Sequence, residues 1–121
     1  MSQQSPSKNT EKINDNNKLD NKLDDEMHAF YERADAFINL ANDLRDKTGH
    51  AGKINASMLY ATARFSAWVA AMGFVKGSDY LKEKDDIIEH FTKNFERMLS
   101  DNIEDYAKNF QQYLQIGKKP D

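Results

Sequence analysis

The sequence INASMLYATARFSAWVAAMGFV occupies Ile54–Val75 and is the most apolar part of the chain. Apolar residues would lie on nearly every side of a helix formed by this stretch, and such a helix is buried between neighbours rather than laid on a surface. Its many alanines would let neighbouring helices approach closely. The sequence therefore predicts a central helix from about Ile54 to Val75, enclosed by its two neighbours, with Gly77 as the C-terminal stop.

A second helix is predicted on the N-terminal side, from about Asp25 to Lys47. Its apolar residues recur at gaps of three and four, which places them on one side of a helix. Asp24 can cap the N-terminus, and Gly49 can end the helix. The residues that form this apolar side are Met27, Phe30, Tyr31, Ala34, Phe37, Ile38, Ala41 and Leu44.

The C-terminal part of the chain predicts either one long helix or two shorter ones. Ser78 is a good N-cap, and an apolar stripe continues from there to Leu114. Asp101 and Glu104 have the spacing of a capping box, so a new helix could begin at Asn102. A single helix is equally compatible with the spacing. The predicted fold is therefore all-α, an antiparallel bundle of three or four helices with a disordered N-terminal tail.

The first 24 residues differ in composition from the rest. They are rich in Ser, Gln, Asn, Lys and Asp, and such a segment cannot bury enough apolar area to become ordered. We expect a disordered tail at residues 1–24, a helical domain at residues 25–116 and a disordered C-terminus at residues 117–121. The tail contains the tandem repeat NKLD–NKLD at residues 17–24. It could form an amphipathic arm with Leu19, Leu23 and Met27 on one stripe, but a solvated tail is the favoured interpretation.

Composition and charge exclude several classes of function. The 121 residues include 17 basic and 20 acidic side chains, a net charge of −3, which argues against a nucleic-acid partner. The apolar run from Ala67 to Val75 is far shorter than the roughly 20 residues that span a bilayer, so no membrane partner is expected. There is no cysteine, which excludes disulfides and suits the cytoplasm.

No pattern of catalytic or metal-binding residues is present. His28 lies three residues after Asp25 and His90 lies four residues after Asp86, but neither a Glu-x-x-His pair nor a His-Glu-x-x-His motif occurs. The serines have no Gly-x-Ser-x-Gly elbow, and no glycine-rich phosphate loop exists. We therefore expect no catalytic residue, no metal and no cofactor.

Arg64 is the most informative single residue, because it lies in the middle of the apolar stretch. A buried charge is costly unless it is paired. Glu32 and Asp35 could pair with Arg64 if the first two helices pack antiparallel, and this interior ion pair is the favoured interpretation. The alternative is an anion-binding arginine in a cleft.

The stripe at the C-terminal end suggests an interaction surface. In a helix that outruns its neighbours, Tyr106, Phe110 and Tyr113 would face solvent, and an uncovered aromatic stripe is uncommon on a monomer. The sequence predicts a non-enzymatic protein–protein interaction module that self-associates. Its expected partner is a second copy of the chain, in a homodimer, or another protein. The alternative is a small-molecule binder or enzyme with a polar cleft around Arg64, Glu32 and Asp35.

Several segments resemble a small, all-helical bacterial family of unknown function. They are FYERADAFI at 30–38, LAN at 40–42, AS at 56–57, LYA at 59–61, ARF at 63–65, ML at 98–99, Asn102, DY at 105–106 and NF at 109–110. The resemblance covers about Met27 to Tyr113. It implies a compact helical domain and carries no established activity. It also suggests that Glu32, Asp35 and Arg64 belong to one polar arrangement.

Overall fold

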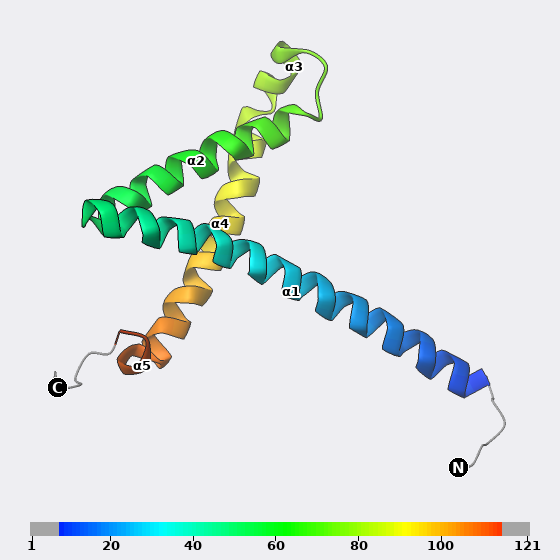
Figure 1. Cartoon of the computed structure of the whole chain (residues 1–121). Coiled ribbons are helices and arrows are strands. Elements are labelled where there is room, and N and C mark those ends of the chain that lie inside the picture. Colours follow the sequence, from blue (N-terminus) through cyan, green and yellow to red (C-terminus); the bar gives the residue numbers. More distant parts are fainter. Residues whose placement is uncertain (1–7, 115–121) are drawn as a thin grey trace, which may run out of the picture. The chain divides into compact units, whose positions relative to one another are not determined.

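The computed structural model describes the backbone of residues 8–114 and the side chains of residues 17–114, and all its regular elements are α-helices (Figure 1). This confirms the all-α prediction for the described residues. The helices are α1 (Lys8–Thr48), α2 (Ala51–Ala71), α3 (Gly77–Lys82), α4 (Lys84–Lys108) and α5 (Phe110–Leu114). They belong to two units, Met1–Leu59 and Tyr60–Asp121, whose boundary falls within α2.

The turn between α1 and α2 lies in the first unit and depends on one glycine. Gly49 has φ +76°, a left-handed conformation that residues with a side chain rarely adopt. Its N–H donates a hydrogen bond to the carbonyl of Arg45, which closes the last turn of α1. The predicted stop of the first helix is therefore in the expected place.

The start of α1 differs from the prediction. The helix begins at Lys8, whereas the sequence analysis placed its start near Asp25 and a disordered tail before it. Residues 8–24 therefore have helical backbone. Composition predicted the tail because so few apolar residues are available there, but Lys, Asn and Asp do not prevent a helix that is continued from a stable one. The division of the chain at residues 24 and 116 stays a prediction, and residues 1–7 and 115–121 lie outside the described residues.

The second unit contains a compact corner between α2 and α3. After α2 ends at Ala71, the N–H groups of Gly73 and Phe74 donate hydrogen bonds of 3.2 and 3.0 Å to carbonyls three residues earlier. The rings of Phe74 and Tyr80 then meet with their centroids 5.4 Å apart. The predicted end of the central helix near Val75 is therefore about four residues late.

The helices after this corner divide differently from either predicted version. Glu83, with φ −92° and ψ 11°, separates α3 from α4, and Asn109, with φ −114° and ψ 31°, separates α4 from α5. α4 continues through the predicted break at Asn102. The capping-box spacing there does not start a new helix, because Asn102 instead donates its side-chain amide to the Met98 carbonyl at 2.7 Å within the same helix.

No side chain among residues 17–114 is buried. In the central helix, Phe65 is 64% exposed and Trp68 is 56% exposed. This helix spans the boundary of the two units, so its enclosure by the neighbouring helices stays a prediction. The partly covered positions of the second unit lie on α2, the corner, α4 and the α4–α5 junction, at Ser66, Ala70, Ala71, Phe74, Tyr80, Ile87, Phe91, Asn94 and Asn109. The antiparallel bundle stays a prediction.

Candidate functional site

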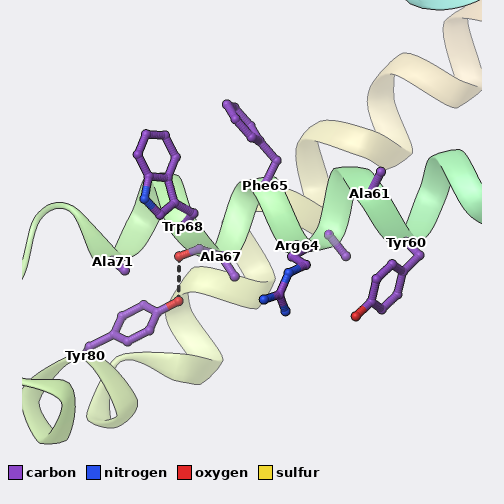
Figure 2. A pocket seen from close by; sticks show the side chains of 9 residues that line it. Tyr60, Ala61, Arg64, Phe65, Ala67, Trp68, Ala71 and Tyr80 are labelled. Atoms are coloured by element: carbon purple, nitrogen blue, oxygen red, sulfur yellow. Dashed lines mark hydrogen bonds between the residues drawn. The ribbon is translucent and has the colours of Figure 1, made fainter. Parts of the chain in front are cut away.

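An open hollow in the second unit surrounds Arg64. It is lined by side chains of α2 and by one tyrosine of α3, namely Tyr60, Ala61, Ala63, Arg64, Phe65, Ala67, Trp68, Ala71 and Tyr80. Figure 2 shows Tyr60 and Arg64 projecting to the same side of α2 as Tyr80, while Phe65 and Trp68 project to the other side in this view. The alanines leave space around the guanidinium group of Arg64.

Tyr80 fixes one edge of this hollow. Its hydroxyl donates a hydrogen bond of 2.6 Å to the main-chain carbonyl of Ala67, one turn along α2 from Arg64 (Figure 2). A helical carbonyl has a second lone pair that can accept such a bond without breaking the helix. The bond ties α3 to α2 and orients the phenol ring along the hollow.

Arg64 has no ion pair or hydrogen bond within the part of the chain whose side chains are described. The predicted partners lie on α1 in the first unit. There, a Glu32 carboxylate oxygen lies 3.7 Å from His28 Nε2, one helical turn away, and Asp35 is exposed. The pairing of Glu32 or Asp35 with Arg64 therefore stays a prediction.

The predicted interaction surface lies where α4 meets α5. Tyr106, Phe110 and Tyr113 are 49%, 46% and 44% exposed. The rings of Tyr106 and Tyr113 pack edge to face, with centroids 4.9 Å apart and planes at 69°. This is a favourable geometry for an aromatic pair. Two of the three predicted residues are therefore in direct contact, and all three are open to solvent.

Asp105 organises this surface. The side-chain amide of Asn109 donates to the main-chain carbonyl and to Oδ1 of Asp105, both at 3.1 Å. The Tyr113 hydroxyl lies 3.4 Å from the same Oδ1. The negative charge of Asp105 raises the pKa of Tyr113 above its ordinary value of 10.0, because it disfavours the phenolate. The carboxylate thus holds the short helix α5 against the end of α4.

The roles of Tyr80 and Asp105 were not predicted. Tyr80 falls within the apolar stripe predicted from Ser78 to Leu114, and no motif around it indicated a hydrogen bond back to α2. Asp105 precedes Asn109 by four residues, which is the spacing of side chains that meet on a helix. That spacing was the available signal.

The described residues give no sign of a metal centre or a membrane span. No three His, Asp or Glu side chains among them gather to hold a metal ion. No helix in the same part of the chain is long and apolar enough to cross a bilayer.

Comparison with known proteins identifies the family. Residues 30–107 match the family described as "Protein of unknown function (DUF3144)". The chain is also similar to the protein NB7890A from Shewanella sp., whose structure was determined by NMR. The two are 32% identical with a TM-score of 0.63, over 74% of this chain and 94% of that one. No curated protein matches. The chain therefore belongs to the DUF3144 family, a small helical family whose function is not known.

Proposed function

We propose that this protein is a non-enzymatic interaction module that self-associates through Tyr106, Phe110 and Tyr113. The observation that carries the proposal is the exposure of these three rings at the junction of α4 and α5, where the rings of Tyr106 and Tyr113 are in contact. Aromatic side chains contribute most of the binding energy in many protein interfaces. Tyr113, which is held by Asp105 and by the Tyr106 ring, loses less conformational freedom on binding than an unrestrained side chain does.

Light scattering over a range of protein concentrations tests this proposal. Replacing Phe110 by Ala should weaken association by about 1–2 kcal/mol, or about tenfold, because it removes one of the three exposed aromatic rings of the proposed surface. Phe37 offers a matched control, since it is 67% exposed, lies outside the stripe, and Phe37→Ala removes the same ring. A wild-type chain that stays monomeric at every concentration would refute self-association.

We further infer that α1 and α2 pack as an antiparallel hairpin that pairs Arg64 with Asp35. Asp35 lies 14 residues before Gly49 and Arg64 lies 15 residues after it. At about 1.5 Å per residue, the two side chains would lie at nearly the same height above the turn. Glu32 would lie one helical turn farther along α1 and could join the same polar network.

A double-mutant cycle with Asp35→Ala and Arg64→Ala tests the pairing. A coupling free energy of about 0.5–3 kcal/mol is expected for residues in contact. Replacing Asp43, an exposed acid on the same helix, provides a cycle with no expected coupling. A zero value for the Asp35 cycle would remove the argument for an interior ion pair.

The second candidate function is a small-molecule site at the hollow around Arg64. The unpaired guanidinium, two tyrosines and a lining of alanines favour a small organic anion with an aromatic part. Titration with such acids, followed by NMR, should shift signals of Tyr60 and Ala67 in the wild type and not in Arg64→Gln. A strong Asp35–Arg64 coupling without any ligand-induced shift would decide against this function. The cytoplasmic location and the absence of catalysis stay predictions from the sequence.

A further inference from the structure

We propose that the N-terminal part of α1 pairs in parallel with the same segment of a second copy of this chain. The inference rests on the proposed self-association and adds to it a segment and an orientation. The segment is the tandem repeat NKLD–NKLD at residues 17–24. It lies outside residues 30–107, which match the family.

The repeat places a narrow apolar stripe on one side of α1. Leu19 and Leu23 are 57% and 50% exposed, and Met27 extends the stripe with 54% exposure. Residues four apart lie above one another on a helix, so these three side chains form one continuous line. α1 continues as a single helix from this segment to Thr48, which gives the line a rigid support.

The same repeat places opposite charges on the two sides of the stripe. In each copy of NKLD, lysine precedes leucine and aspartate follows it, and consecutive residues on a helix are about 100° apart. One side therefore carries the lysine row, Lys18 and Lys22, and the other side carries the aspartate row, Asp20 and Asp24. None of these four side chains has an ion-pair partner among the described residues.

This charge arrangement selects the partner and its direction. When two identical helices pair in parallel about a twofold axis along the helices, the lysine row of each copy faces the aspartate row of the other. In an antiparallel pair, lysine faces lysine and aspartate faces aspartate, which is unfavourable. Charges beside an apolar seam set partner choice and orientation in this way in coiled coils. Glu26 lies beyond the lysine row and limits the complementary segment to the repeat.

Sedimentation of two charge variants of the full chain tests the proposal. Asp20→Lys/Asp24→Lys makes both rows basic, and Lys18→Asp/Lys22→Asp makes both rows acidic. Each variant alone should associate about tenfold more weakly than the wild type, because several exposed attractions become repulsions. An equal mixture of the two should recover wild-type affinity. A mixture no tighter than either variant would overturn the proposal, and one tighter than the wild type would indicate antiparallel pairing and overturn the orientation.

A cross-linking experiment gives an independent readout. The chain has no cysteine, so a single introduced thiol has only the thiol of another copy as its partner. Parallel pairing in register places Leu23 opposite itself, so Leu23→Cys should form a disulfide dimer under mild oxidation. Asn21→Cys, on the outer side of the helix, is the control. Equal cross-linking at both positions would contradict the proposed seam.

These experiments separate this inference from the proposed function. If Phe110→Ala abolishes association while both charge variants behave like the wild type, the C-terminal surface stands and the α1 pairing falls. If the charge variants weaken association and Phe110→Ala does not, the pairing stands and the aromatic surface falls. A monomeric wild type would overturn both.

Discussion

Two tyrosine hydroxyls link neighbouring helices in the second unit. Tyr80 joins α3 to a carbonyl of α2, and Tyr113 joins α5 to Asp105 of α4. Both helices are short, with six and five residues, and a helix of that length is not stable by itself. At the residue scale, these side chains therefore keep the two short helices in place.

Removing the Tyr80 hydroxyl should lower the free energy of unfolding. We expect Tyr80→Phe to cost about 0.5–1.5 kcal/mol, the usual net value of one hydrogen bond, because the bond to Ala67 is lost and the ring is kept. Urea denaturation measures this loss. Tyr60→Phe is the matched control, because the Tyr60 hydroxyl makes no hydrogen bond within the described residues. Equal stability of the two variants would show that the bond to Ala67 contributes nothing.

The Tyr113–Asp105 contact predicts a pH dependence. The folded pKa of Tyr113 is raised above 10.0, so the folded state holds this proton more tightly than the unfolded chain does. Its contribution to stability is therefore fully present below about pH 10 and is lost as pH rises through the folded pKa. Absorbance titration should show one tyrosine ionising later than in Asp105→Asn. Identical titration curves would contradict the assignment.

At the element scale, periodicity predicted the positions of the helices but, apart from the end of α1 at Thr48, not their ends. The apolar spacing of α2 and α4 was sufficient, because a run of such spacing has few alternatives to a helix. The breaks at Glu83 and Asn109 have no glycine or proline to mark them. The Asp105–Tyr113 contact spans the break at Asn109, and Tyr80, three residues before Glu83, bonds back to Ala67 of α2. Contacts of this kind leave little trace in the local sequence. The charged start of α1 was missed for a different reason. The lack of apolar residues shows that this segment cannot be buried, but it does not show whether a helix can extend through it.

The two glycines near the α1–α2 turn should respond in opposite ways to alanine. Gly49→Ala places a side chain at φ +76° and should cost about 1–2 kcal/mol. Gly52 lies inside α2 with nothing within 4 Å of an added Cβ, so Gly52→Ala should stabilise by about 0.5–1 kcal/mol. Thermal unfolding of both variants checks the difference. Destabilisation of equal size in both would show that backbone conformation at Gly49 is not the determining factor.

At the scale of the whole molecule, the sequence led to the correct class of fold, while the enclosure of α2 by its neighbours stays a prediction. The apolar character of α2 predicted enclosure, but apolar composition does not specify whether the cover comes from the same chain or from another copy. The candidate site, too, was only partly predictable from the sequence. Arg64 was identified from its apolar neighbours, whereas its hollow also depends on Tyr80, which comes from a different helix.

Association of the wild-type chain should show the heat-capacity signature of apolar burial. If Tyr106, Phe110 and Tyr113 become covered, the heat-capacity change of association is negative, because apolar surface leaves water. Dilution calorimetry at several temperatures measures this quantity. Phe110→Ala should reduce its magnitude at equal degrees of association. A value near zero in the wild type would indicate that the contact is mainly polar.

The single tryptophan of the chain gives the protein an intrinsic fluorescent reporter. Trp68 projects from α2, is 56% exposed and has the ring of Phe65 beside it with centroids 5.4 Å apart. Water-exposed indole emits at longer wavelength and is readily quenched by acrylamide. Any partner, helix or ligand that covers this part of α2 would therefore shift the emission to shorter wavelength and reduce the quenching, without an added label. Emission from one position can therefore be assigned to one helix.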